Sequence, residues 1–216
     1  MKKEIIISAA VDGREKYSEI VKELEQSIID SGWRGDVDIY KSFPDWIIPH
    51  KSIPYAFKYQ FIRRKVHQGY KKIIWLDSTM RLVPGKYILD LLLDDGEGVV
   101  GFDNIGHPLE FYINDTAIDN IGPFNKSAKQ LWGGALIFDF ETDTAFEVLN
   151  EIIDQIVLGS FNDDNTARPG FKGHRHDQAV LSAIFNQMGI ELLPYGIIAA
   201  PKDVTEDTYI IYGDAK

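Results

Sequence analysis

A predicted strand that ends in an aspartate constrains the fold of this chain more than any other feature. The run KKIIWLDST occupies residues 71–79, and its four consecutive apolar residues, two of them β-branched, predict a strand in the interior of a sheet. Asp77 follows directly, at the carboxyl end of that strand. In open α/β sheets this end is where ligands bind. The run therefore predicts both a central strand and a binding site at its edge.

The elements before this strand predict an α/β fold. Residues 5–10 predict a first strand, apolar residues at helical spacing predict a helix over residues 17–31, and residues 37–40 predict a second strand. This β-α-β start is typical of a mostly parallel, Rossmann-like sheet with helices on both faces. At 216 residues the chain can bury one substantial core, so we expect residues 1–216 to form a single domain.

The second half of the chain is predicted to add one longer strand, two helices, and short strands over residues 191–193, 197–200 and 209–212. Residues 131–140 predict a glycine turn that leads into a strand. Helices are expected over residues 142–158, where Thr142 can cap the first turn, and over residues 176–188. Residues 103–131 show no period, which predicts either a functional loop or lid, or small elements that the pattern does not reveal.

Composition excludes several classes of function. The formal net charge of −10 repels nucleic-acid backbones, so we expect no nucleic-acid partner. The chain has no cysteine, which rules out disulfides, thiolate zinc sites and a cysteine nucleophile. The N-terminal apolar stretch is too short for a signal peptide, and no apolar run approaches the ~20 residues of a transmembrane segment. We therefore expect a cytoplasmic protein.

A second polar cluster lies much later in the chain than Asp77. The run GHRHDQ covers residues 173–178 and leads into the last predicted helix. Asp177 can act as a general base on a hydroxyl group or stabilise positive charge at a sugar's anomeric carbon, and His176 can bind a metal or a diphosphate. The alternative is a helix start, with His176 or a neighbour at the cap and Asp177 favoured in the first turn by the helix dipole.

Two further groups of residues suit a diphosphate and a sugar. Lys58 lies on the helix expected after Pro54, and its cation can neutralise a leaving diphosphate; the alternative is a solvated helix face. Trp132 precedes Gly133 and Gly134, a combination that offers a sugar ring an aromatic face and a close backbone approach. The alternative for this second group is a tight turn beside a core tryptophan.

The order of these features resembles that of the GT-A glycosyltransferases, especially their small bacterial and viral members. Four runs carry the resemblance, which spans residues 5–195. They are the strand at residues 5–10, the run PYAFK at 54–58 with Gly69-Tyr70 at the end of its helix, WLDST at 75–79 in the place of the family's Asp-x-Asp motif, and WGGA at 132–135 followed by HDQ at 176–178.

The resemblance implies an enzyme that transfers a sugar from a nucleotide-sugar donor, a UDP- or GDP-sugar, to a hydroxyl of a glycan or related acceptor. It also implies a role for each matched residue. The residues expected to bind the nucleotide-sugar, with the two alanines beside the base, are Ala9, Ala10, Lys58, Asp77, Ser78 and Thr79. The residues expected on the side of the acceptor and the sugar are Trp132, Gly133, Gly134, His176 and Gln178. Asp177 is the expected catalytic residue.

One position departs from the family motif. Thr79 stands where the family usually has a second carboxylate, which helps to hold a divalent metal, Mn²⁺ or Mg²⁺, on the diphosphate. Hard cations prefer charged oxygen ligands, so a threonine weakens the expectation of a metal. Asp77 and His176 are the candidate metal ligands.

Two other functions stay open at this point. A metal-dependent phosphoesterase would be built on His174, His176 and Asp177, although the sequence offers no second His/Asp cluster at metal-ligand spacing. A non-catalytic module of the same fold that binds a nucleotide or sugar is favoured by Thr79. Tight binding of UDP or GDP without turnover of any donor would distinguish the module from a transferase.

Overall fold

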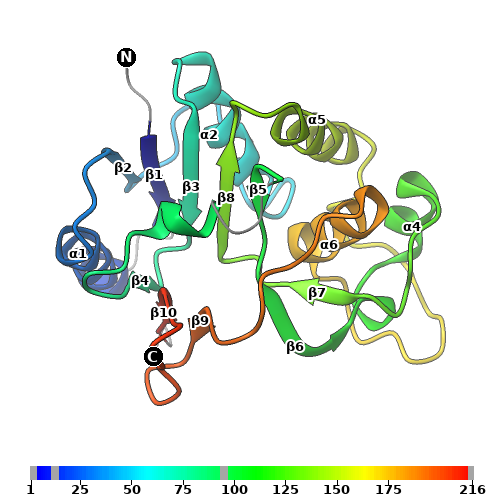
Figure 1. The fold of residues 1–216 in the computed structure, drawn as a ribbon. Helices are drawn as coiled ribbons and strands as arrows, with labels where there is room; N and C mark the ends of the chain where they lie inside the picture. Colours follow the sequence, from blue (N-terminus) through cyan, green and yellow to red (C-terminus); the bar gives the residue numbers. More distant parts are fainter. Residues whose placement is uncertain (1–3, 11–14, 93–96, 214–216) are drawn as a thin grey trace.

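The computed structural model describes residues 4–10, 15–92 and 97–213. Its main sheet has five strands in the order β2-β1-β3-β8-β5 (Figure 1). These strands are β1 (Glu4–Ala9), β2 (Asp36–Tyr40), β3 (Lys72–Leu76), β5 (Val99–Val100) and β8 (Ala135–Asp139). β1 pairs in parallel with β2 and β3, whereas β8 is antiparallel to both β3 and β5.

The sheet is therefore mixed. The prediction of a mostly parallel, Rossmann-like sheet was wrong. The strand predicted within residues 131–140 becomes β8, which runs in the opposite direction between β3 and β5. A short apolar run predicts a buried strand but carries no information about its direction. The broader prediction of an α/β fold with helices on both faces of the sheet is confirmed.

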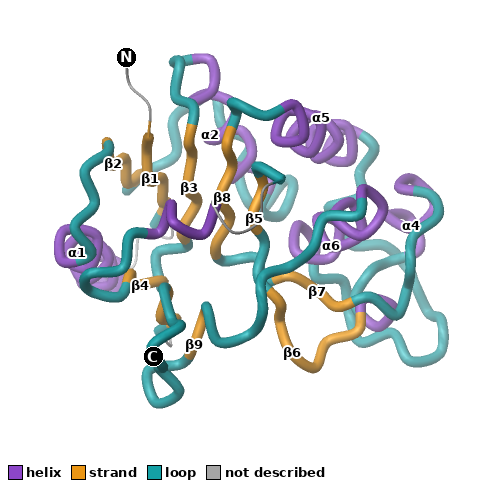
Figure 2. Tube along the Cα trace, in the orientation of Figure 1, coloured by secondary structure: helices purple, strands orange, loops and turns teal. Residues whose placement is uncertain are grey.

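Helices pack on both faces of the main sheet (Figure 2). One face contributes Ile73 and Trp75 to a core shared with α2 (Ala56–His67), α5 (Asp143–Val157) and α6 (His176–Met188). The other face contributes Ile74 and Leu76 to a core shared with α1 (Glu15–Asp30). Successive residues of a strand point to opposite faces, which is why a single apolar run supplies both cores.

Residues 103–131 fold into small elements, the second of the two outcomes that the sequence left open. They are β6 (Asp103–Pro108), the 3-10 helix η2 (Leu109–Phe111), α4 (Asp115–Ile121) and β7 (Lys129–Leu131). β6 and β7 pair in antiparallel fashion with a register shift. Asn114 starts α4, because its side chain accepts a hydrogen bond from the Ala117 amide. Thr142 caps α5 in the same way, as its position predicts.

A second small sheet brings the end of the described chain back to the main sheet. It has the strand order β4-β10-β9, and its members are β4 (Met80–Leu82), β9 (Ile198–Ala199) and β10 (Ile210–Tyr212). The 3-10 helix η1 (Ile88–Asp90) follows β4 in the chain. Just after β10, the Gly213 amide donates a hydrogen bond to the Thr79 carbonyl at 2.9 Å. Residues from the C-terminal region therefore lie beside the strand that ends in Asp77.

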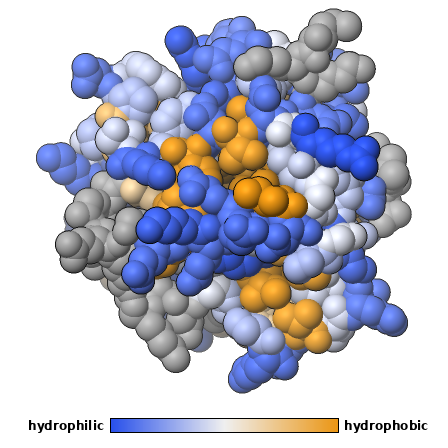
Figure 3. Space-filling model, turned by 90° about the vertical axis from the view of Figure 1, so that its left-hand side faces the viewer, coloured by the Kyte–Doolittle hydropathy of each residue, from blue (hydrophilic) through white to orange (hydrophobic). Residues whose placement is uncertain are grey.

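The face of the molecule seen in Figure 3 is mostly hydrophilic, with two groups of hydrophobic residues separated by a hydrophilic band. Within residues 4–10, 15–92 and 97–213, no helix combines the length and the apolar character needed to cross a membrane.

Candidate active site

The candidate site lies at the edge of the main sheet where β3 ends and β8 begins. Because these strands are antiparallel, Ala135 at the start of β8 pairs with Leu76 at the end of β3. The next residue along, Asp77, donates its amide hydrogen to the Gly134 carbonyl at 2.7 Å. The antiparallel direction of β8, which the sequence did not reveal, therefore brings Gly133 and Gly134 next to Asp77.

All twelve candidate residues from the sequence line one or both of two adjoining pockets. The larger pocket has a volume of about 470 Å³, and its walls include Lys58, Asp77, Thr79, Trp132, Gly133, Gly134, His176, Asp177 and Gln178. The smaller pocket has a volume of about 240 Å³, and its walls include Ala9, Ala10, Lys58, Asp77, Ser78 and Thr79. The structure thus brings the whole set together, while the role of each residue stays a prediction.

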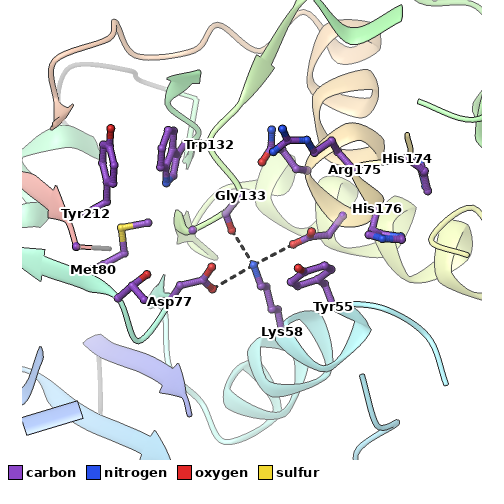
Figure 4. A pocket seen from close by; sticks show the side chains of 15 residues that line it. Tyr55, Lys58, Asp77, Met80, Trp132, Gly133, His174, Arg175, His176 and Tyr212 are labelled. Atoms are coloured by element: carbon purple, nitrogen blue, oxygen red, sulfur yellow. Dashed lines mark hydrogen bonds and ion pairs between the residues drawn. The ribbon is translucent and has the colours of Figure 1, made fainter. Parts of the chain in front are cut away.

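Lys58 lies at the centre of the residues that line the larger pocket (Figure 4), and it also lines the smaller pocket. Its Nζ is 3.1 Å from Asp77 Oδ1 and 3.0 Å from Asp177 Oδ2, and it donates a hydrogen bond to the Gly133 carbonyl at 2.8 Å. A lysine ammonium has three N–H donors, and each has a partner here. In this conformation Lys58 has no donor left for a direct hydrogen bond to a ligand, and its charge is what it can offer.

The charges of this cluster depend on one another. Burial alone disfavours the ammonium form, but the neighbouring carboxylates of Asp177 and Asp77 outweigh it and raise the pKa of Lys58 above its ordinary value. Burial also raises the pKa of Asp177, and the charge of Asp77 adds to this effect while Lys58 opposes it. A carboxyl group whose pKa is raised is better matched to accepting a proton near neutral pH.

Asp77 is held by its own strand and by the turn before β8. Its Oδ1 accepts a hydrogen bond from Trp75 Nε1 at 2.7 Å. A Cβ atom on Gly134 would lie 2.1 Å from Met80 Cε and 3.4 Å from Asp77 Oδ2, so a side chain at this position would push into the pocket wall. Glycine at position 134 is what allows the backbone to approach this closely.

The backbone is strained at two positions in the site. Of the non-glycine residues that the structure describes, Tyr55 and His176 have positive φ, 61° and 42°, and their rings lie 5.8 Å apart. Such conformations cost on the order of 1–3 kcal/mol each and tend to occur at functional sites. Tyr55 precedes α2 and His176 begins α6, and both residues line the larger pocket. The two strained residues therefore lie at helix starts beside this pocket.

Both helix starts favour a negatively charged ligand. Neither α2 nor α6 has a side-chain hydrogen bond at its N-cap. At the start of α2 the amides of Ala56 and Lys58 already donate to the Ile53 and Tyr55 carbonyls, so the partial positive charge of the helix dipole, rather than free N–H groups, favours an anion there. Lys58 of α2 and Asp177 and Gln178 of α6 all line the larger pocket, so both first turns border the same space.

The two histidines of the GHRHDQ run have different environments. Both ring nitrogens of His174 are engaged by the backbone: Nδ1 accepts from the Asn114 amide at 3.3 Å, and Nε2 donates to the Ser160 carbonyl at 2.9 Å. His176 Nδ1 donates to the Phe161 carbonyl at 2.9 Å, which leaves its Nε2 available to a ligand. His174 therefore acts as a structural residue, whereas His176 can still contact a substrate.

The residues present do not fit a divalent metal held by Asp77. Asp77 Oδ1 already accepts from Trp75 Nε1 and pairs with Lys58, whose ammonium fills the position between the two carboxylates. Within the described part of the chain, no group of three or more His, Cys, Asp or Glu side chains is arranged to hold a metal ion. A metal-dependent phosphoesterase would need such a group of ligands, and the described residues do not provide one.

Sequence reasoning assigned no site role to several residues that line the pockets. They are His50, Tyr55, Phe57, Trp75, Met80, Arg175, Tyr212 and Gly213. Tyr55, Phe57, Trp75 and Arg175 lie within the runs PYAFK, WLDST and GHRHDQ that the sequence singled out, and this position was the available signal. Tyr212 had none, because it reaches the site only through the pairing of β10 with β4; its ring lies 4.6 Å from the ring of Trp132.

The buried position of His174 predicts that the protein loses stability in mild acid. Burial lowers the pKa of His174 from its ordinary value of 6.5. The folded protein then binds fewer protons at this residue than the unfolded chain, so its contribution to stability is present above pH 6.5 and is lost as the pH falls below it. The slope that this one residue adds is at most about 1.4 kcal/mol per pH unit.

Urea unfolding between pH 7.5 and pH 5 measures this slope. The matched variant is His174→Asn, whose Oδ1 keeps an acceptor for the Asn114 amide but which cannot titrate. We expect a shallower slope in the variant, and equal slopes in both proteins would contradict the assignment to His174.

One solved structure similar to this chain is that of a glycosyltransferase involved in the glycosylation of the major capsid of PBCV-1. The likeness covers 97% of this chain and 93% of that chain, with a TM-score of 0.55 and 16% sequence identity. No protein-family model matches the chain, and no curated protein matches it. The chain therefore has a glycosyltransferase fold, which confirms at the level of fold the resemblance seen in the sequence.

Proposed function

We propose that this protein is a glycosyltransferase of the GT-A type that moves a sugar from a nucleotide-sugar donor, a UDP- or GDP-sugar, to a hydroxyl of a glycan or related acceptor. One observation carries the proposal: Asp77 and Asp177, a hundred residues apart in the chain, meet at a single buried lysine between two adjoining pockets. A donor in one pocket and an acceptor in the other would meet at these carboxylates. We further propose that residues 1–216 act as one domain.

The smaller pocket is the proposed site of the nucleotide. Ala9 and Ala10 at the end of β1 line it, and small side chains let a flat ring approach the backbone. The rings of His50 and Tyr55 lie 4.5 Å apart on another wall, where they can pack against a base or a ribose. The diphosphate would then lie near the first turn of α2, where the helix dipole favours negative charge.

The larger pocket is the proposed site of the acceptor. The rings of Trp132 and Tyr212 form an aromatic wall against which the C–H groups of a sugar can pack. Asp177 would take the proton of the acceptor hydroxyl as its oxygen bonds to the anomeric carbon, and the nucleoside diphosphate leaves with the electrons of the broken bond. The positive charge of Lys58 would stabilise the carboxylates and the departing diphosphate through space.

A non-catalytic module that binds a nucleotide or sugar is the second candidate. Two observations favour it: Thr79 in place of an acid, and a lysine whose donors are all used inside the protein. Turnover of the donor separates the two candidates, because a module would bind without releasing the sugar.

A nucleotide that binds the smaller pocket is expected to raise the melting temperature. A ligand present at a hundred times its Kd adds about 2.7 kcal/mol to the free energy of unfolding. For a chain of this size, that gain corresponds to a rise of roughly 5–10 °C. The measurement is a thermal-shift screen of nucleoside diphosphates and their sugars, followed by calorimetric titration and by an assay for release of the sugar.

Asp77→Asn is the site variant for this screen, and Asp139→Asn is its control. Asp139 pairs with Lys72 at 3.1 Å at the opposite end of the β3–β8 pair. We expect the shift to shrink in Asp77→Asn and to persist in Asp139→Asn. The absence of a shift with every UDP- and GDP-compound would argue against the proposed donor class.

A further inference from the structure

We propose that the ammonium group of Lys58 is the resident cation of this site and takes the place of a divalent metal between Asp77 and Asp177. The inference rests on the proposed function only for the identity of the ligand that binds beside Lys58. Its central test uses the protein alone and does not depend on any donor.

The first argument is the shell of atoms around Nζ. Three oxygens surround it: Asp77 Oδ1 at 3.1 Å, Asp177 Oδ2 at 3.0 Å and the Gly133 carbonyl at 2.8 Å. Two carboxylates and a backbone carbonyl are also the oxygen ligands that hard divalent cations select. The residues that would form a metal shell therefore already enclose a cation that belongs to the chain.

The second argument is burial. The Lys58 side chain is 2% exposed and that of Asp177 is 4% exposed, so the pair is shielded from water. Aromatic rings complete the enclosure, since Nζ lies 5.0 Å from the ring centre of Tyr55 and 5.9 Å from that of Trp75. Ring faces attract a cation, and they add to the attraction of the carboxylates.

The third argument is charge. A buried lysine ordinarily loses its proton more easily, but the two carboxylates reverse this tendency and raise the pKa of Lys58. The ammonium is therefore charged at neutral pH. A divalent ion entering the same shell would face this positive charge at short range and would have to displace it.

The lysine also explains why a threonine is sufficient at position 79. In the cluster, one cation faces two carboxylates, Asp77 and Asp177. A third carboxylate at position 79 would add negative charge beside a diphosphate without adding a counter-ion. With Lys58 as the fixed cation between the two carboxylates, the dipoles at the first turns of α2 and α6 are left to face a nucleoside diphosphate, and we expect it to bind without a metal.

The test is a Mn²⁺ titration of three purified proteins without nucleotide: the wild type, Lys58→Met and Lys65→Met. Methionine keeps much of the length of lysine and removes its charge. Lys65 is the matched control, because it is a second buried lysine of α2, paired with Asp38. We expect no binding of Mn²⁺ at this site in the wild type or in Lys65→Met, and a gain on the order of tenfold or more in Lys58→Met, whose carboxylates are freed.

The gain should disappear in the double variant Lys58→Met with Asp177→Asn. Where Lys58→Met is too unstable for titration, Mn²⁺ should raise its melting temperature and leave those of the other two proteins unchanged. Wild-type binding of Mn²⁺ as tight as that of Lys58→Met would overturn the inference. The absence of any gain or stabilisation in Lys58→Met would overturn it as well.

A second arm addresses the ligand. We expect the affinities for UDP and GDP to agree within about twofold in EDTA and in Mn²⁺, because the site supplies its own cation. Binding that appears only with Mn²⁺ would overturn the inference while supporting the proposed donor. Binding in neither condition would count against the proposed donor, and the Mn²⁺ titration of the free protein would still decide the role of Lys58.

Discussion

Replacing Asp177 by asparagine is expected to lower kcat for sugar transfer, or for hydrolysis of the donor by water, by about 10²- to 10⁴-fold. Asparagine has the same shape and can still accept a hydrogen bond from Lys58, but it cannot take a proton from an acceptor hydroxyl. Asp77 and the first turn of α2 are unchanged in the variant. The affinity for the donor is therefore expected to stay within a few-fold of the wild-type value.

The experiment compares kcat with the Kd of the donor in three proteins: the wild type, Asp177→Asn and Asp139→Asn. Asp139→Asn removes a carboxylate that also pairs with a lysine, Lys72, but at the far end of the same strands. It should keep both activity and affinity. If Asp177→Asn keeps the wild-type kcat, Asp177 is not the general base. If the variant loses donor binding together with kcat, Asp177 positions the donor instead.

Much of the site could be predicted because its signals are local. The apolar run that ends in Asp77 reports a buried strand, and the carboxyl end of such a strand is a place where ligands bind. The GHRHDQ run concentrates five polar residues at the predicted start of α6, and this start borders the larger pocket. Patterns of this kind depend on short-range periodicity, which one sequence contains.

The remaining features depend on contacts between distant segments. The direction of β8 follows from its pairing with β3 and β5, and nothing within its own apolar residues encodes it. Tyr212 reaches the pocket because β10 pairs with β4. The role predicted for Lys58 beside a diphosphate stays a prediction, and nothing in the sequence showed that its ammonium pairs with two carboxylates from separate parts of the fold. Such pairings are decided by the assembled core rather than by spacing.

Replacing Lys58 by methionine is expected to lower the free energy of unfolding at pH 7 by about 3–5 kcal/mol. Removing one partner of a buried ion pair leaves its counter-charge uncompensated in a poorly hydrated environment, and this is the cost that such changes show. Here the variant leaves two carboxylates facing each other, with Asp177 almost fully buried. Methionine can fill the space of the lysine stem, so the loss comes from charge rather than from a cavity.

The control is again Lys65→Met. Lys65 is as buried as a core residue, but its partner Asp38 has a side chain that is 42% exposed and can be hydrated once the lysine is gone. Exposed carboxylates gain at most about 1 kcal/mol from an ion pair. Urea unfolding of both variants at pH 7 should therefore separate the two lysines by a few kcal/mol, although they lie on the same helix.

The pH dependence of the loss in unfolding free energy of Lys58→Met distinguishes a lost charge pair from lost packing. In the wild type the pKa of Asp177 is already raised by burial and by Asp77, and removing Lys58 takes away the interaction that opposes the rise. A carboxyl group whose pKa is higher in the folded protein binds more protons there than in the unfolded chain, so stability falls as the pH rises above the ordinary value of 3.8. The deficit of Lys58→Met should accordingly be largest at pH 7 and shrink toward pH 4.5, as the carboxyl group is protonated. A deficit of the same size at both values would mean that the lysine stem, rather than its ammonium, holds this site together.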